Sequence, residues 1–184
     1  ETKDFLLVID EAYIEFSDAQ SLIYRVDKYP NICVLRTFSK AWGLAGARLG
    51  YIVSSADILE QVRKVKPLLD INILAIKAVC FLLDRYHLVQ DYIERVREGR
   101  TYLEQELGRL GIDCISGFAN FVHVRLPEEC SPEDVEQRLR DQGFRVRVAG
   151  GTASVLDGCI RTTVGPKEQM TDFVSRLVAI LGRR

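Results

Sequence analysis

The sequence predicts an α/β protein, in which part of a sheet is followed by long helices and then by a smaller α+β unit. Three observations support this prediction. Short apolar runs alternate with loops in the first third of the chain, apolar residues recur every three or four positions in the middle, and short apolar runs return after Gly111. With 184 residues, 47% hydrophobic and 28% charged, the chain can build one or two cores. We expect two domains, residues 1–110 and 111–184.

Three strands are predicted in the first third of the chain. The apolar run at 5–9 is typical of a buried parallel strand, a second strand at 32–35 follows the turn at 29–31, and a third covers 49–53. Only residues 37–47 separate the second and third strands, fewer than a parallel crossover usually needs, so the third is expected to run antiparallel to the second. Because the chain opens directly on a central strand, we expect it to be a fragment.

The middle of the chain, from about residue 55 to residue 109, carries helical signals. Pro67 interrupts the first helical region, and a loop at 70–72 precedes a second apolar helix that ends near Leu83. A long amphipathic helix follows, with one stripe at intervals of three and four: Leu88, Tyr92, Val96, Gly99, Leu103, Leu107 and Leu110.

After Gly111 the pattern indicates a small α+β unit. Strands are predicted at 120–125, 144–148 and 159–164. Between the first two, a helix begins at Ser131, which is a good N-cap, with Pro132 at its first position. The last helix is expected to pack across the small sheet through one apolar stripe: Met170, Phe173, Val174, Leu177, Val178 and Leu181.

Composition argues against several classes of function. The 25 Lys and Arg residues nearly balance the 26 Asp and Glu residues, so no large charge excess favours nucleic acid or an anionic membrane. No apolar run approaches the roughly 20 residues that span a bilayer. The five cysteines are widely spaced without a C-x-x-C pair, and the two histidines lie too far apart to indicate a metal cluster. We expect small-molecule chemistry, no metal and a cytoplasmic setting.

Polar residues follow the first two predicted strands at the point where each strand ends. The run 10–13 (D-E-A-Y) comes after the first strand and the run 37–40 (T-F-S-K) after the second, so both reach the edge where open α/β sheets bind ligands. Arg48 follows Lys40 by eight residues, and the two glycines between them allow a tight loop. A single site with an amine, a carboxylate, hydroxyls and a guanidinium is therefore predicted.

Three motifs in this order carry a resemblance to a known family. They are D-E-A-Y at 10–13, T-F-S-K-A-W-G-L-A-G-A-R-L-G-Y at 37–51, and G-C-I-R-T-T-V-G at 158–165. Together they resemble the fold-type I aminotransferases that use pyridoxal 5'-phosphate (PLP), and most of all the histidinol-phosphate aminotransferase group. The resemblance covers nearly the whole chain. It implies that this chain contains the end of the large-domain sheet and the small domain. It also implies that the full-length parent is a homodimer.

The resemblance assigns roles to three residues near the cofactor ring. A lysine amine can condense with the aldehyde of PLP and afterwards carry a proton at the substrate carbon, which is the role expected of Lys40. A carboxylate beside the pyridine nitrogen favours its protonated form, as expected of Asp10. Tyr13 would hydrogen-bond the phenolic oxygen of the ring.

Anion ligands complete the site that the resemblance implies. Thr37 and Ser39 offer hydroxyls to the cofactor phosphate, and Arg48 offers a planar fork of donors. Arg161 is expected to bind the substrate carboxylate, and Arg147, which lies near the position of the family's other late arginine, is a second candidate. Taken alone, each of these residues would more often be a surface group or an ion pair, and their joint spacing favours the functional interpretation.

Three functions stay open at this point. The first is transamination between an amino acid or histidinol phosphate and a 2-oxo acid, with 2-oxoglutarate as the expected acceptor. The second is phosphothreonine decarboxylation, and the third is a non-catalytic aminotransferase-like sensor domain of a transcription regulator. The K-x-P-Y-N-V-N-like segment of the family is altered at 66–72, which keeps Pro67 and Asn72 but replaces the aromatic residue and the first asparagine. Because the family's earlier half is missing, we expect the chain alone to be inactive.

Overall fold

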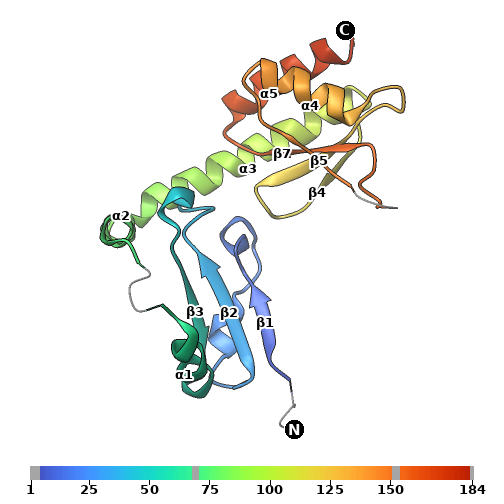
Figure 1. The fold of residues 1–184 in the computed structure, drawn as a ribbon. Helices are drawn as coiled ribbons and strands as arrows, with labels where there is room; N and C mark the ends of the chain where they lie inside the picture. Colours follow the sequence, from blue (N-terminus) through green and yellow to red (C-terminus); the bar gives the residue numbers. More distant parts are fainter. Residues whose placement is uncertain (1–4, 68–70, 151–153, 183–184) are drawn as a thin grey trace. The chain divides into compact units, whose positions relative to one another are not determined.

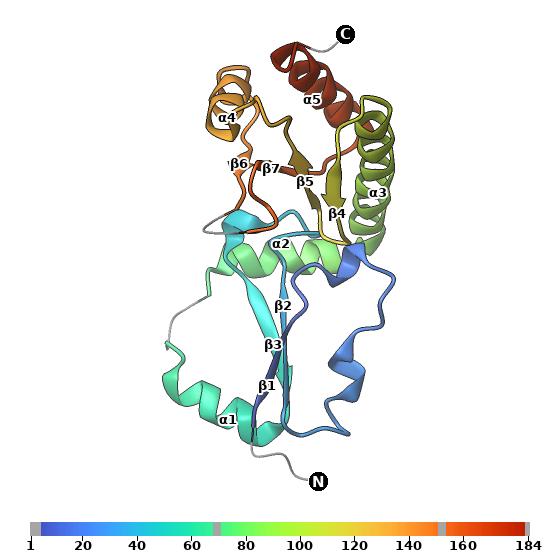
Figure 2. The ribbon, with the colours of Figure 1, turned by 90° about the vertical axis from the view of Figure 1, so that its right-hand side faces the viewer.

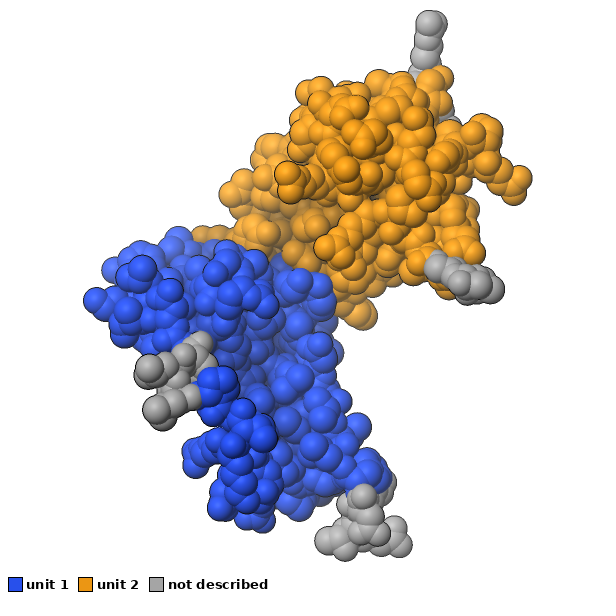
Figure 3. All heavy atoms as spheres, in the orientation of Figure 1, with its two compact units in different colours: residues 1–90 blue, residues 91–184 orange. Residues whose placement is uncertain are grey.

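The computed structural model describes residues 5–67, 71–150 and 154–182, which form two compact units (Figures 1 and 3). The first unit ends at Gln90 and the second begins at Asp91. This division falls inside helix α3 (Tyr86–Arg109), which therefore contributes to both units. The domain boundary expected at residue 110 stays a prediction.

The first unit contains a three-stranded sheet in the order β1-β2-β3. Its strands are β1 (Leu7–Asp10), β2 (Ile32–Thr37) and β3 (Gly50–Ser54). Strands β1 and β2 are parallel, and β3 runs antiparallel to β2, which confirms the prediction from the short connection. The carboxyl ends of β1 and β2 and the start of β3 therefore lie at the same edge of the sheet (Figure 1).

The core of the first unit lies behind β2. Ile32 and Val34 pack with Val26 there, and two short 3-10 helices lie on the connection between β1 and β2, η1 (Ile14–Phe16) and η2 (Leu22–Arg25). Strand β1 is parallel to β2 as predicted, but the prediction that β1 is buried is wrong. It forms the edge of the described sheet, so its residues Leu7 and Val8 remain 43% and 51% exposed.

Two helices follow the sheet as the sequence predicts, α1 (Ala56–Val65) and α2 (Ile73–Leu83). The side chain of Asn72 caps α2 by accepting a hydrogen bond from the Leu74 amide at 2.8 Å. The preceding loop was expected at 70–72, and its first residue lies outside the described residues.

The buried stripe of α3 differs by one position at its beginning from the predicted one. Its buried residues are Val89, Ile93, Val96, Gly99, Leu103 and Leu107. Leu88, expected in the stripe, is 44% exposed instead. Apolar residues stand side by side at 88–89 and 92–93, so spacing alone does not decide which of each pair faces the core.

The second unit holds a four-stranded antiparallel sheet in the order β4-β5-β7-β6. Its strands are β4 (Cys114–Ser116), β5 (Phe121–Arg125), β6 (Arg147–Val148) and β7 (Cys159–Thr163). Strand β4 was not predicted, and β6 is shorter than the expected 144–148. The Phe144 amide donates to the Leu139 carbonyl at 2.9 Å, which keeps the start of that segment in the turn after α4 (Pro132–Asp141).

One face of this sheet is covered by helices (Figure 2). Val122, Val124 and Ile160 are fully buried on it, and α4 lies beside the last helix, α5 (Lys167–Ile180). The predicted cap of α4 is confirmed, since the hydroxyl of its N-cap serine accepts from the backbone amide three residues later at 3.3 Å. Most of the predicted stripe of α5 is buried: Met170, Phe173, Val174 and Leu177.

Gly99 marks a close approach of α3 to the backbone at Gly165. A Cβ atom there would lie 2.0 Å from the carbonyl oxygen of Gly165, which is backbone and cannot move alone. We expect Gly99→Ala to destabilise this unit by about 1–3 kcal/mol, the usual cost of overpacking, despite the better helix propensity of alanine.

Thermal and urea unfolding of the 184-residue chain measure this loss. Gly108→Ala is the matched control, because it lies in the same helix and no described atom stands within 4 Å of the place that a Cβ atom would take there. That substitution should be neutral or stabilise by up to about 1 kcal/mol. Equal stability of the two variants would contradict the proposed close contact.

Candidate functional site

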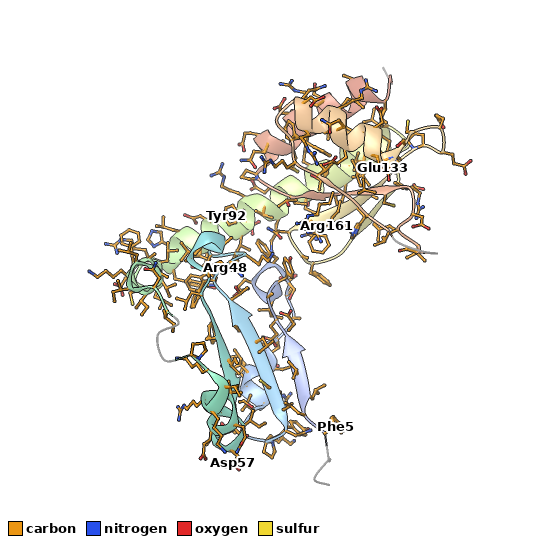
Figure 4. All side chains as sticks on the ribbon, in the orientation of Figure 1. Phe5, Arg48, Asp57, Tyr92, Glu133 and Arg161 are labelled. Carbon is orange, nitrogen blue, oxygen red and sulfur yellow. The ribbon has the colours of Figure 1, made fainter. Side chains whose placement is uncertain are left out.

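The predicted site residues of the first unit gather at one edge of its sheet. Asp10 ends β1, Thr37 ends β2, and Arg48 stands just before β3 (Figure 4). The loop between β2 and β3 is closed by backbone hydrogen bonds from Phe38 to Leu49 at 3.1 Å and from Leu44 to Phe38 at 2.9 Å. This closure holds the lysine loop over the carboxyl ends of the parallel strands.

Lys40 and Tyr13 meet at this edge although they come from different connections. The Lys40 Nζ lies 5.0 Å from the centre of the Tyr13 ring, within the range of a cation–π attraction. Asp10 directs one carboxylate oxygen back to the Ala12 amide, which donates to it at 2.9 Å. This Asx turn fixes the carboxylate at the start of the segment that leads to Tyr13.

The anion ligands expected at this edge come from the loop itself. The Thr37 hydroxyl accepts from the Ser39 amide at 3.0 Å, which brings the two hydroxyl residues into one turn. Arg48 has a left-handed backbone with φ of 52°, and no other non-glycine residue in the described part of the chain has a positive φ. Such strain costs about 1–3 kcal/mol and is typical of functional sites, so it supports a role for this arginine.

The donor set at this edge fits PLP. It offers an amine, a carboxylate, a phenol, two hydroxyls and a guanidinium, which match the aldehyde, pyridine nitrogen, phenolic oxygen and phosphate of the cofactor.

The sequence did not reveal a buried charged network, formed by Glu11, Glu15 and Arg36, beside the loop at 38–49 that carries Lys40. Glu11 accepts from the Ser21 hydroxyl and the Leu22 amide, each at 2.7 Å, and lies 2.9 Å from Arg36 Nε. Glu15 lies 2.9 Å from Arg36 Nη1 and accepts from Trp42 Nε1 at 3.3 Å. The available signal was Arg36, a charged residue that lies in β2 directly after its apolar run.

Trp42 packs against aromatic rings beside the loop that carries Lys40. Its ring lies 5.1 Å from that of Phe38, edge to face, and 5.4 Å from that of Tyr86. Phe38 in turn lies 5.5 Å from Tyr51 on β3. Burial, partly offset by Arg36, raises the pKa of Tyr51.

Both late arginines lie in the sheet of the second unit. Arg161 on β7 (Figure 4) is directly opposite Arg147 on β6 and His123 on β5, so the three residues form one row across the sheet. The Arg161 guanidinium lies 4.7 Å from the centre of the Phe121 ring. Burial and then the charge of Arg161 lower the pKa of His123.

This row has the features of an anion site. Like charges directly opposite each other on neighbouring strands destabilise a sheet. Neither arginine of the row forms an ion pair with a carboxylate within the described ranges. The row therefore has unused capacity for a carboxylate or phosphate. The sequence assigned no chemistry to His123, and only the strand register places it here.

No group of three or more metal-ligating side chains occurs among the residues that the structure describes. All five cysteines are free thiols, with Cys33 and Cys159 buried. Over the described part of the chain, no helix is long and apolar enough to cross a membrane.

Comparisons with known proteins identify the family of the chain. The family model described as aminotransferase class I and II matches residues 1–177. The chain is 38% identical, over 178 residues, to histidinol-phosphate aminotransferase 1 of Carboxydothermus hydrogenoformans, and it covers 49% of that protein. This match includes 97% of the present chain. The chain thus spans about half the length of the relatives it matches.

Two solved structures show the same fold. Histidinol-phosphate aminotransferase of Sinorhizobium meliloti, solved in complex with PLP, superposes with a TM-score of 0.85 at 28% identity, covering 96% of this chain and 49% of that one. L-threonine-O-3-phosphate decarboxylase of Porphyromonas gingivalis superposes with a TM-score of 0.83 at 23% identity, covering 96% and 55%. The second likeness concerns the fold alone.

Proposed function

The chain belongs to the class I and II aminotransferase family, and from this premise we propose that the whole protein is a PLP-dependent aminotransferase. Its substrates would be histidinol phosphate and 2-oxoglutarate, as the names of the relatives suggest. The observation that carries the proposal is the meeting of Lys40 and Tyr13 at the sheet edge where Asp10 ends β1.

Three residues of the first unit would serve the reacting end of the site. Bound PLP supplies an electron sink for the substrate's amino carbon. The Lys40 amine would hold the cofactor and then move a proton at that carbon as a general acid–base. Asp10 would keep a positive charge at the pyridine nitrogen, and the Tyr13 hydroxyl would donate to the phenolic oxygen.

The remaining candidates would bind anions. Thr37, Ser39 and Arg48 would hold the cofactor phosphate through hydroxyls and a planar guanidinium. Arg161 would bind the carboxylate of the amino-acid or 2-oxo-acid substrate, and Arg147 would assist with the second anionic group. Support for this role comes from the pairing of the two arginines across the strands without a carboxylate partner within the described ranges.

Assembly and location follow from the same proposal. The whole protein would form a homodimer and act in the cytoplasm on small molecules. The 184 residues alone would not turn over substrate, since they cover 49% of the aminotransferase they match and leave the apolar edge of β1 exposed. A decarboxylase acting on a phosphorylated amino acid is the second candidate, favoured by the fold of the Porphyromonas gingivalis enzyme.

Purified whole protein with added PLP tests the proposal. A visible absorption band that forms with PLP, together with glutamate formation from histidinol phosphate and 2-oxoglutarate, is the expected result. Carbon dioxide release from O-phosphothreonine without amino transfer would favour the decarboxylase. Binding of PLP with no turnover of either substrate would favour a sensor domain, and the 184-residue chain serves as the comparison without turnover.

Arg161→Lys in the whole protein should raise the KM for the 2-oxo acid by about 10-fold. The point charge of lysine cannot reproduce a bidentate guanidinium, and one such hydrogen bond to a charged group contributes about 1.5 kcal/mol or more. Steady-state kinetics measure this effect, and PLP titration should give an unchanged dissociation constant. Arg145→Lys, at an exposed position just before β6, is the matched control. Loss of PLP with unchanged KM would remove Arg161 from the substrate role.

A further inference from the structure

The charged network behind the lysine loop joins the two segments that carry the proposed catalytic groups. Glu15 belongs to η1, which begins directly after Tyr13. Its partners come from the other segment, because Arg36 directly precedes Thr37 and Trp42 lies two residues after Lys40. A single carboxylate oxygen, Oε1, makes both contacts, at 2.9 Å and 3.3 Å.

The network is too buried to be explained as a surface ion pair. The side chains of Glu11, Glu15 and Arg36 are 6%, 10% and 13% exposed. Replacing such a group by apolar residues is often neutral or favourable for stability, so stability alone does not explain its presence. A better explanation is that the network holds the surrounding segments in one arrangement.

Both sides of Tyr13 are held by this network. Glu11, two residues before Tyr13, is fixed by Arg36 and by the Ser21 hydroxyl, while Glu15, two residues after it, is fixed by Arg36 and Trp42. The backbone between them is further tied by the Ile14 amide, which donates to the Glu11 carbonyl at 3.2 Å. The position of the Tyr13 ring relative to Lys40 therefore depends on these contacts.

We infer that Glu15 is a positioning residue, which sets the placement of Lys40 against Tyr13 through its shared contacts with Arg36 and Trp42. The inference rests on the proposed function, and it assigns Glu15 no contact with substrate or cofactor. A misplacement of about 1 Å at a catalytic group can cost about 100-fold in rate, so a partial loosening of this link should have a measurable effect.

Two substitutions in the whole protein separate position from charge. Glu15→Ala removes both contacts and should lower kcat by about 10-fold or more, with KM changed less than about 2-fold, because alignment rather than binding is lost. Glu15→Gln can keep Oε1 in place and put its amide nitrogen where Oε2 lies, an atom with no hydrogen-bond partner among the described residues. It should stay within about 3-fold of the unsubstituted protein. Glu60→Ala, an exposed carboxylate on α1, is the control.

A spectroscopic signature distinguishes positioning from a general loss of structure. The visible band of PLP bound at Lys40 should change its pH midpoint in Glu15→Ala and keep it in Glu15→Gln. Trp42→Phe removes the Nε1 donor but keeps a ring, and combined with Glu15→Ala it should cost less than the product of the two single effects. In the 184-residue chain, whose single tryptophan is Trp42, fluorescence reports whether this packing survives in Glu15→Ala.

The outcomes are separable. A rate loss in Glu15→Gln equal to that in Glu15→Ala would overturn the inference, because it would assign the effect to charge. Multiplicative effects of Glu15→Ala and Trp42→Phe would overturn it as well. A whole protein that takes up no PLP would instead overturn the proposed function, on which the inference depends.

Discussion

Substitution of Lys40 by alanine is expected to abolish amino transfer by the whole protein. A positioned general acid–base group contributes roughly 10²- to 10⁴-fold to a rate, and the loss of the amine that holds the cofactor adds to this cost. Lys40 is half-buried, lies beside Tyr13 and is the only lysine in the loop between β2 and β3, so this loop offers no second amine to replace it. Steady-state turnover and PLP retention on gel filtration measure the loss.

A chemical label identifies the lysine directly. Borohydride reduction of the PLP-loaded protein, followed by peptide mapping, should place the pyridoxyl group on Lys40. Lys77, an exposed residue on α2, gives the matched control, and its substitution by alanine should leave both turnover and labelling unchanged. A label on Lys64, Lys66 or Lys77 in the unsubstituted protein would contradict the assignment.

Sequence patterns predicted the order of elements better than their surroundings. The antiparallel β3 followed from a chain-length argument, and the cap of α4 followed from Ser131 and Pro132, because both depend on local geometry. The exposure of β1 could not be predicted in this way. An apolar run shows that a strand is suited to burial, whereas actual burial depends on which elements lie beside it.

Contacts between distant segments limit how much of the site can be predicted from the sequence. Runs at two strand ends could be placed at one edge because parallel strands end together, and the structure confirms that arrangement for Asp10 and Thr37. The row of His123, Arg161 and Arg147 depends on strand register, which spacing does not reveal. Likewise, the link from Glu15 to Trp42 joins residues that are far apart in the chain.

Asp10→Asn in the whole protein should lower kcat by about 10- to 100-fold. A carboxylate attracts the positive charge on the pyridine nitrogen, and a hydrogen bond between charged partners contributes about 1.5–3 kcal/mol, which corresponds to this range. Asparagine keeps an oxygen that can accept from the Ala12 amide, so the Asx turn should persist. The effect then measures the charge rather than the shape of the loop.

Kinetics and spectra together decide this prediction. The kcat for amino transfer should fall, while the midpoint of thermal unfolding stays unchanged. The visible band of the bound cofactor should shift, because the positive charge on its pyridine nitrogen is less favoured without the carboxylate. Asp57→Asn is the control, since Asp57 is an exposed carboxylate at the start of α1, at the opposite end of the first unit from Arg48 (Figure 4). Unchanged kcat and an unchanged band in Asp10→Asn would show that the carboxylate is not beside the ring nitrogen, and Asp10 would then be a turn residue only.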